Sequence, residues 1–188
     1  MNTMKLLCIG DSLTYGYEME ISNRWTNLLE KELEITVLNA GINGDTTTGI
    51  LSRFMPLIKD FKPTHVLIYG GTNDLWFGLK NEFIISNIYA MCKQALHYNV
   101  NPLVGIPTPC FNLEELNVIG ENYQKRINQF QENLIEFCSN KDIAYLDFNN
   151  GILQAYFMED GIHYNDNGHM FITKQLKEKL PTILKKGV

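Results

Sequence analysis

The sequence predicts an α/β domain in which helices cover both faces of a parallel β-sheet. Short apolar segments alternate with longer amphipathic segments along the chain. The apolar segments are continuous and rich in Val, Ile and Leu, which is typical of parallel strands buried on both faces. No internal repeat, low-complexity tract or flexible linker divides the chain. We therefore expect a single domain over residues 1–188, with right-handed crossovers between the strands.

Five short apolar segments are expected to form the strands of this sheet. Each is bounded by polar or glycine-containing stretches that interrupt a strand. In chain order the expected strands are Lys5–Ile9, Ile35–Leu38, His65–Tyr69, Leu103–Ile106 and Ile143–Leu146.

The amphipathic segments between these strands predict helices. In the first of them, Trp25, Leu29 and Leu33 recur at helical spacing and share one face. The expected helices are Ser22–Glu34, Thr46–Phe61, Glu82–Tyr98, Glu114–Ser139 and Asp166–Leu184.

The longest irregular stretch is Pro107–Asn117, which carries the apolar residues Phe111 and Leu113. Apolar side chains beyond the end of a strand can line a pocket, or they can fold down over the helix that follows. Both interpretations remain open from the sequence.

Charge and hydropathy exclude several classes of protein. The net charge is −5, and no run of Lys and Arg stands out apart from the short tail Lys185-Lys186, so we expect no basic patch for nucleic acid. No apolar run approaches the roughly 18 residues that a membrane-spanning helix needs. Residues 1–10 enter a strand without the features of a secretory signal. We expect a cytoplasmic protein with no nucleic-acid partner and no membrane span.

The four cysteines are expected to be buried free thiols. Cys8 lies in an apolar strand-like run, and Cys92 and Cys138 lie in helix-like segments. Together with Cys110 they match neither a zinc-binding spacing nor a redox CxxC pair. This pattern fits a reducing compartment.

Segments with polar and ionisable side chains follow the ends of the expected strands. Gly10 to Thr14 reads GDSLT, residues 39–46 read NAGINGDT, residues 70–74 read GGTND, and residues 160–163 read DGIH. Functional sites of open α/β sheets form beyond the carboxyl ends of the strands. These four segments are therefore expected to meet in one place.

Together the segments hold the groups that acyl transfer requires. The Ser12 hydroxyl becomes a nucleophile when a base removes its proton, and His163 can be that base. Asp160 precedes His163 by three residues across a glycine, so its carboxylate can orient the imidazole. The backbone N–H groups of Ser12 and Gly44 and the amide of Asn73 are suitable donors for an oxyanion hole.

The four segments resemble the conserved blocks of SGNH hydrolases, the GDSL lipases and esterases. The block residues are Ser12 in GDSLT, Gly44 in INGDTT, Asn73 in GGTND and His163 in DGIH. They stand in the family's order and span most of the chain, which makes the resemblance much more specific than a lone GDSL motif.

The resemblance implies a three-layer α/β/α fold similar to flavodoxin, with five parallel strands in the order 2-1-3-4-5. It implies hydrolysis of a small-molecule ester or thioester through a covalent acyl-enzyme, without a metal or other cofactor. One residue departs from the family pattern: Tyr164 follows His163 where the family more often has proline. A tyrosine there can alter the entry to the last helix.

Five aromatic residues near these segments are candidates for a substrate pocket. Tyr15 and Tyr17 follow the serine block, Trp76 and Phe77 follow the asparagine block, and Phe111 lies in the irregular stretch. Each can line the pocket or anchor its loop. The carboxylates that neighbour catalytic positions, Asp11 and Asp74, are interpreted as structural hydrogen-bonding groups, and Asp45 to Thr48 as helix-capping residues.

Alternative interpretations remain for the individual residues. Ser12 can cap a helix, Gly44 can permit a left-handed turn, Asn73 can bridge a loop, and Asp160 can be an ordinary turn residue. Their common positions at strand ends favour the catalytic interpretation. The other histidines, His65, His97 and His169, have no carboxylate placed by a tight turn.

Two other functional classes are alternatives to the esterase. A flavodoxin-like binding module could use residues 44–49 as a phosphate loop, but that loop follows the second strand rather than the first. A pseudo-enzyme that only binds acylated sugars or lipids would have lost a catalytic residue, and none is missing. The α/β-hydrolase fold is excluded because Thr14 stands where its GxSxG elbow requires glycine.

The sequence leaves the substrate and the oligomeric state open. Enzymes of the resembled family act on acetylated sugars, lysophospholipids, acyl thioesters and aryl esters. Pocket depth distinguishes these classes, and pocket depth depends on tertiary structure.

Overall fold

A computed structural model describes residues 4–112 and 114–185, so Leu113 lies outside the described residues. Its centre is a five-stranded parallel sheet with the order β2-β1-β3-β4-β5, which confirms the predicted topology. The strands are β1 (Lys5–Gly10), β2 (Thr36–Gly41), β3 (His65–Tyr69), β4 (Asn101–Ile106) and β5 (Tyr145–Asp147).

Helices follow the strands in alternation. The α-helices are α1 (Ser12–Tyr15), α2 (Trp25–Leu33), α3 (Thr47–Phe61), α4 (Thr72–Trp76), α5 (Asn81–His97), α6 (Tyr123–Asn140) and α7 (Asp166–Lys185). Two 3₁₀ turns, η1 (Ile21–Asn23) and η2 (Gln154–Tyr156), complete the described elements.

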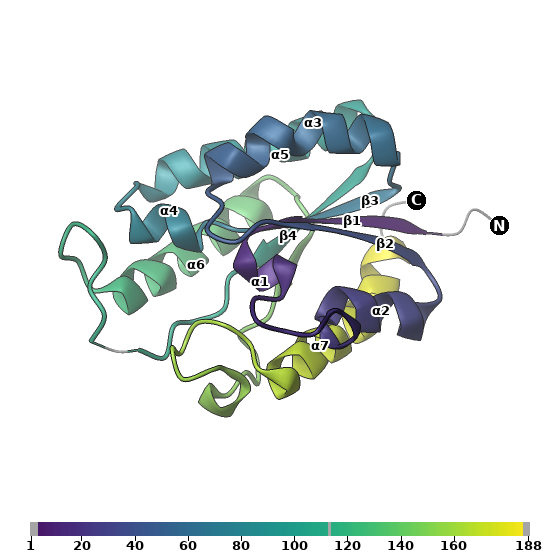
Figure 1. Cartoon of the computed structure of the whole chain (residues 1–188). Helices are drawn as coiled ribbons and strands as arrows, with labels where there is room; N and C mark the ends of the chain where they lie inside the picture. The colour runs from purple at the N-terminus through teal and green to yellow at the C-terminus, as the bar shows by residue number, and fades with distance from the viewer. Residues whose placement is uncertain (1–3, 113, 186–188) are drawn as a thin grey trace.

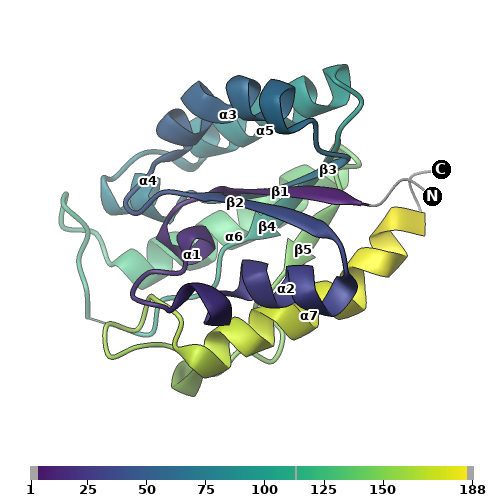
Figure 2. The same cartoon turned by 45° about the vertical axis from the view of Figure 1, so that its right-hand side comes forward.

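The helices form a layer on each side of the sheet, as Figures 1 and 2 show from two directions. Helices α3 and α5 lie above the sheet in Figure 1, and α2 and α7 run side by side below it. Successive residues of β1 point to opposite faces, so Leu7 and Ile9 pack in the layer of α3, α5 and α6, whereas Leu6 and Cys8 pack against α2 and α7. Burial on both faces explains why the strands read as continuous apolar runs.

The helix expected over Glu114–Ser139 is wrong at its start, because α6 begins only at Tyr123. The side chain of Asn117 accepts hydrogen bonds from the N–H groups of Ile119 and Glu121, and Gly120 adopts a left-handed φ of +80°. Such local side-chain bonds offer the backbone an alternative to the helix. Residues 116–122 therefore form a hairpin-like turn that projects beside α4.

The last strand begins two residues later than expected, at Tyr145. Asp142 has a left-handed φ of +52°, and the Ile143 N–H donates to the Cys138 carbonyl 2.9 Å away. This bond closes the end of α6 and places Ile143 in the helix terminus. An apolar residue in a helix cap is difficult to distinguish from one at a strand start by sequence alone.

The four cysteines are buried and free, as expected. Burial raises the pKa of the Cys92 and Cys138 thiols to about 12, so both remain uncharged at neutral pH. Within the described residues, no helix combines the length and the apolar character needed to cross a lipid bilayer.

Candidate active site

Ser12 is the first residue of α1, directly beyond the carboxyl end of β1. Asp11 caps this short helix by accepting a hydrogen bond from the Leu13 N–H at 2.9 Å. A Cβ at Gly10 would collide with the Tyr69 carbonyl oxygen of the neighbouring strand and with the Thr14 hydroxyl. Only glycine therefore lets β1 turn into α1 here. The turn leaves the Ser12 side chain at the sheet edge, about 9% exposed.

The structure brings Ser12, His163 and Asp160 into one hydrogen-bonded line. The Ser12 Oγ lies 2.9 Å from His163 Nε2, although the two residues are separated by 151 positions in the chain. On the far side of the ring, His163 Nδ1 lies 2.6 Å from Asp160 Oδ2. This order of hydroxyl, imidazole and carboxylate is the arrangement that activates a serine for nucleophilic attack.

A tight turn places Asp160 against the imidazole. Gly161 adopts a left-handed φ of +68°, and the second carboxylate oxygen of Asp160 accepts from the N–H groups of Ile162 and His163 at 2.8 and 2.9 Å. Partial burial disfavours the charged carboxylate, but the hydrogen bonds from the His163 ring and these N–H groups outweigh it. The pKa of Asp160 is therefore lowered, and the carboxylate is charged at neutral pH.

The ring of Tyr17 packs against the imidazole of His163. Its ring centroid lies 4.4 Å from that of His163 with a tilt of 36°. The Tyr17 N–H donates to the Ser12 carbonyl at 3.2 Å, so the segment that follows α1 stays close to Ser12 and His163. This contact restricts the rotation of the His163 ring.

A hydrogen bond to Asp45, the residue after Gly44, holds the side chain of Asn73 next to the Gly44 loop. The Asn73 side-chain amide donates one hydrogen bond to the Asp45 carbonyl at 3.0 Å. An amide NH₂ has two hydrogens, so a second remains for another acceptor. Gly44 has a left-handed φ of +74°, and a Cβ there would meet no atom within 4 Å. A side chain at this position would therefore point into open space.

Arg53 of α3 joins the loops of the first two strands, a role that the sequence did not reveal. Its guanidinium pairs with the Asp45 carboxylate at 2.9 Å and donates to the carbonyls of Ala40 at 2.6 Å and Gly10 at 2.9 Å. These partners are eight to 43 residues away in the sequence. No local pattern in the sequence marks Arg53 for this role, because its partners meet only at the sheet edge.

Asp11 and Asp74 form internal ties between the segments, in agreement with their structural interpretation. Asp11 accepts from the Thr72 hydroxyl at 2.9 Å, which connects α1 to α4. Asp74 accepts from the Thr47 N–H at 2.8 Å and the Thr47 hydroxyl at 2.6 Å, which connects α4 to the start of α3. Burial raises the pKa of both carboxyls, that of Asp11 to about 6.

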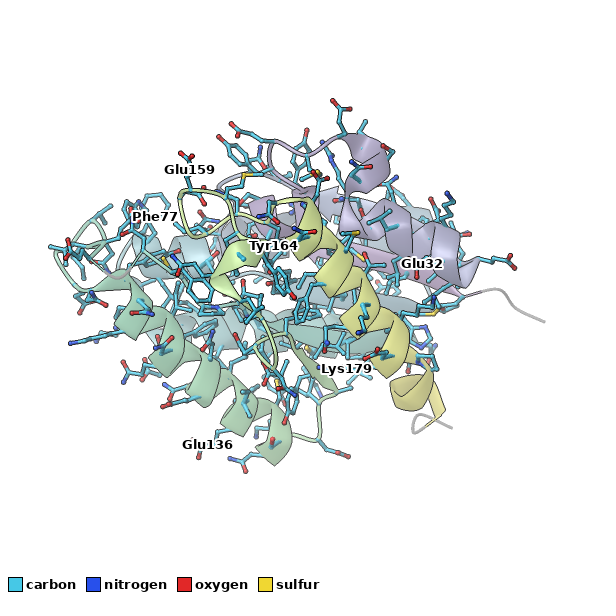
Figure 3. All side chains as sticks on the ribbon, turned by 90° about the horizontal axis from the view of Figure 1, so that it is seen from below. Glu32, Phe77, Glu136, Glu159, Tyr164 and Lys179 are labelled. Carbon is cyan, nitrogen blue, oxygen red and sulfur yellow. The ribbon has the colours of Figure 1, made fainter. Side chains whose placement is uncertain are left out.

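The aromatic candidates lie around this edge in different environments. Trp76 packs edge-on against Tyr123 at 5.3 Å, in contact with the core. Phe77 is 54% exposed and lies at the periphery of the molecule in Figure 3. Tyr15 carries the guanidinium of Arg24 over its ring at 4.2 Å.

Phe111 lies beside the turn that carries Asp160 and His163. Its N–H donates to the Gly161 carbonyl at 2.8 Å, and its ring contacts Phe157 at 4.9 Å. The irregular stretch therefore packs against the turn as well as bordering the site.

The other histidines occupy structural positions. His65 starts β3, His97 ends α5, and the buried His169 of α7 accepts a hydrogen bond from the Trp25 N–H at 3.2 Å. A separate cavity of about 540 Å³ lies near the starts of β3 and β4, where it is lined by His65, Asn101 and other residues. It shares no residue with the Ser12 site.

Comparison with known proteins identifies the family of the chain. A model of the GDSL-like lipase/acylhydrolase family matches residues 8–171. An arylesterase of Vibrio mimicus is 29% identical over 184 residues, covering 94% of this chain and 88% of the relative. The thioesterase 1/protease 1/lysophospholipase L1 of Escherichia coli K12 is 29% identical over 186 residues, covering 95% and 84%.

A solved structure shows the same fold. The psychrotrophic esterase EstA of Pseudoalteromonas sp. superimposes with a TM-score of 0.81 at 23% identity, covering 96% of this chain and 98% of that protein. The family model spans both the Ser12 and the His163 segments and most of the sheet between them. The chain thus belongs to the GDSL-like lipase/acylhydrolase family and is a carboxylic ester hydrolase.

Proposed function

We propose that Ser12 is the nucleophile, His163 the general base and Asp160 the orienting carboxylate of this hydrolase. The observation that carries the proposal is the pair of hydrogen bonds at 2.9 Å and 2.6 Å on the two nitrogens of His163. With the charged Asp160 on Nδ1, the ring carries its proton there and presents the lone pair of Nε2 to the Ser12 hydroxyl.

The proposed reaction proceeds through an acyl-enzyme. His163 accepts the Ser12 proton while Oγ attacks the ester carbonyl, which forms a tetrahedral intermediate. The protonated imidazole then donates that proton to the departing alcohol or thiol. Water, deprotonated by the same imidazole, attacks the acyl-enzyme. The bond between Oγ and the acyl carbon then breaks, the imidazole returns the proton to Ser12 Oγ, and the carboxylic acid leaves.

We assign the oxyanion hole to the Ser12 and Gly44 N–H groups and the Asn73 amide. The hydrogen bond from Asn73 to Asp45 supports this assignment, because it holds the amide one residue from Gly44. The absence of a side chain at Gly44 also supports it, since no Cβ stands in the way of an approaching substrate oxygen. Donors fixed before the reaction stabilise a developing negative charge at little reorganisation cost.

The proposed substrates are small carboxylic esters and acyl thioesters. Relatives named as an arylesterase and as a thioesterase and lysophospholipase support both classes. A series of p-nitrophenyl esters and acyl thioesters from acetyl to palmitoyl separates them. A steep fall of kcat/KM beyond short acyl groups would identify a short-chain esterase, and a maximum at long chains would identify a lipid acylhydrolase.

The role of Ser12 is tested by Ser12→Ala with p-nitrophenyl acetate and butyrate. We expect kcat to fall by about 10³-fold or more, because removal of the nucleophile leaves only the oxyanion donors and substrate binding. A fluorophosphonate probe should label Ser12 in the wild type and leave the variant unlabelled. Equal hydrolysis by the two proteins would refute the assignment.

A further inference from the structure

Tyr164, which follows His163 directly, is the centre of a buried cluster of hydroxyl groups. Its side chain is 2% exposed, and its hydroxyl lies 2.6 Å from the Tyr69 hydroxyl and 3.0 Å from the Thr108 hydroxyl. Tyr69 is the last residue of β3, and Thr108 lies two residues beyond β4. Figure 3 shows Tyr164 in the segment just before α7, inside the outline of the molecule.

The backbone around Tyr164 holds the two limbs of its loop to each other. The Met158 N–H donates to the His163 carbonyl at 2.7 Å, and the Asn165 N–H donates to the Tyr156 carbonyl at 3.1 Å. These bonds stay within residues 156–165. The loop is also joined to the segment beyond β4 by the bond from the Phe111 N–H to the Gly161 carbonyl, and Phe157 packs in the apolar layer with α2 and α7. The Tyr164 hydroxyl connects the loop to the ends of two strands.

The tie reaches the strand beside the one that carries Ser12. In the parallel pairing of β1 with β3, Tyr69 is the register partner of Gly10, which stands two residues before Ser12. The cluster therefore places the residue after His163 against the register partner of the serine turn. The segments that carry Ser12 and His163 are therefore both connected to Tyr69 at the end of β3.

The phenol groups of the cluster remain protonated. Burial raises the pKa of Tyr69 to about 12, and burial also raises the pKa of Tyr164 well above its usual range. A neutral phenol donates one hydrogen bond and accepts others, so a central hydroxyl can bond to both partners at once. Removing the Tyr164 hydroxyl breaks its bonds to both Tyr69 and Thr108. Removing the Tyr69 hydroxyl leaves the Tyr164–Thr108 bond intact.

We propose that the hydroxyl of Tyr164 is a positioning group for His163. It fixes the loop against β3 and β4 and so holds Nε2 within hydrogen-bond distance of Ser12 Oγ. The inference rests on the function proposed above, in which His163 is the base. A misplacement of about 1 Å in a catalytic group can reduce the rate by about 10²-fold, so a tie at the adjacent residue affects turnover directly.

The test measures ester hydrolysis by Tyr164→Phe, which keeps the ring and removes the hydroxyl. We expect kcat to fall by about tenfold, with KM within about twofold of wild type, because the substrate contacts are unchanged. Tyr69→Phe is the matched control, since it removes one phenol from the same cluster but preserves the Tyr164–Thr108 bond. Its kcat should fall by no more than about threefold.

The double variant Tyr69→Phe/Tyr164→Phe distinguishes positioning from stability. It also removes the Tyr69 hydroxyl, which has lost its Tyr164 partner, so its melting temperature should recover relative to Tyr164→Phe. Its kcat should remain as low as that of Tyr164→Phe, because the tie is still missing. A kcat that returns to the wild-type value, or that never fell in Tyr164→Phe, would overturn the proposal.

A crystal structure of Tyr164→Phe gives a reading that does not depend on activity. The expected result is a His163 ring displaced beyond hydrogen-bond distance from Ser12 Oγ, and an unchanged ring position contradicts the inference. If Tyr164→Phe fails to fold, Thr108→Val removes one of the two bonds and should give an intermediate loss of kcat. Loss of the proposed function itself is recognised separately, by equal activity of wild type and Ser12→Ala.

Discussion

Asp160 performs two tasks with its two oxygens. One oxygen accepts from the backbone N–H groups of Ile162 and His163, which shapes the turn, and the other contacts the imidazole at 2.6 Å. An amide can retain the first task because its carbonyl still accepts hydrogen bonds. It fails at the second, because an NH₂ group facing Nδ1 favours the wrong tautomer of the ring.

Asp160→Asn should therefore separate the two tasks. We expect kcat for p-nitrophenyl butyrate to fall by roughly 10³- to 10⁴-fold, because Nε2 then carries the proton and cannot accept one from Ser12. The melting temperature, followed by circular dichroism, should change by only a few degrees. Asp160→Ala provides the control, since it removes both tasks and should also lower the melting temperature. Retention of kcat in the asparagine variant would contradict the assigned role.

At the scale of elements, side-chain hydrogen bonds connect the loops at the carboxyl ends of the strands, where Ser12 lies. The Asp11–Thr72 bond joins α1 to α4, and the Asp74–Thr47 bonds join α4 to α3. Arg53 adds the ends of β1 and β2 to the same network. Loops at the end of a parallel sheet have no ladder bonds of their own, so polar ties of this kind determine where their backbone donors point.

Arg53→Lys should disturb the site more than the fold. A lysine has a single ammonium and cannot reproduce the planar fork that reaches Asp45, Ala40 and Gly10 together. We expect kcat to fall by about tenfold through a displaced Gly44 loop, with a loss of about 1–2 kcal/mol in the free energy of unfolding.

The matched control is Arg126→Lys, which weakens a comparable interaction on α6. Arg126 pairs with Glu121 and donates to the Leu79 carbonyl. Arg126→Lys should lower the free energy of unfolding, measured with urea, by a similar amount to Arg53→Lys. Its kcat should stay within about twofold of wild type. Equal kcat values for the two variants would show that Arg53 has no specific role in the site.

At the scale of the whole molecule, burial shifts the pKa values of two buried groups, Asp11 and His169, in opposite directions. Burial raises the pKa of Asp11 to about 6 from an ordinary 3.8. Burial lowers the pKa of His169 to about 4 from an ordinary 6.5. Between about pH 4 and 6 the folded protein holds a proton on Asp11 that the unfolded chain has released, whereas the unfolded chain holds one on His169 that the folded protein lacks.

These two groups should give opposing slopes of stability with pH. The contribution of Asp11 to the free energy of unfolding falls as pH rises from about 4 to 6, and that of His169 is lost as pH falls from about 6.5 to 4. Each spans up to roughly 3 kcal/mol, so they largely cancel in the wild type. Urea unfolding at several pH values should show a steeper rise of stability with pH in Asp11→Asn, and a shallower one in His169→Gln. Parallel curves for all three proteins would refute the assignment.

Patterns confined to one segment were predicted well. The strand His65–Tyr69 is confirmed at both ends, and β1 and α3 differ from prediction by a single residue, because burial of a strand or helix face is written directly into local spacing. Predictions failed at the starts of α6 and β5, where a turn competes with an apolar pattern, and they missed three residues at the end of β2 and two at the start of β4. Asn117 and Gly120 delayed α6, and the cap at Ile143 delayed β5.

The sequence by itself determined the sheet and its helices, the order of the four blocks, and the Asp160–His163 pair, which lies within one turn of the chain. Only the tertiary structure brought Ser12 within 2.9 Å of His163, and only it revealed Arg53 and Tyr164 as ties between loops. The physical reason is range. Backbone propensity and hydrophobic periodicity act over a few residues, whereas these contacts join residues between eight and 151 positions apart that meet because parallel strands end at a common edge.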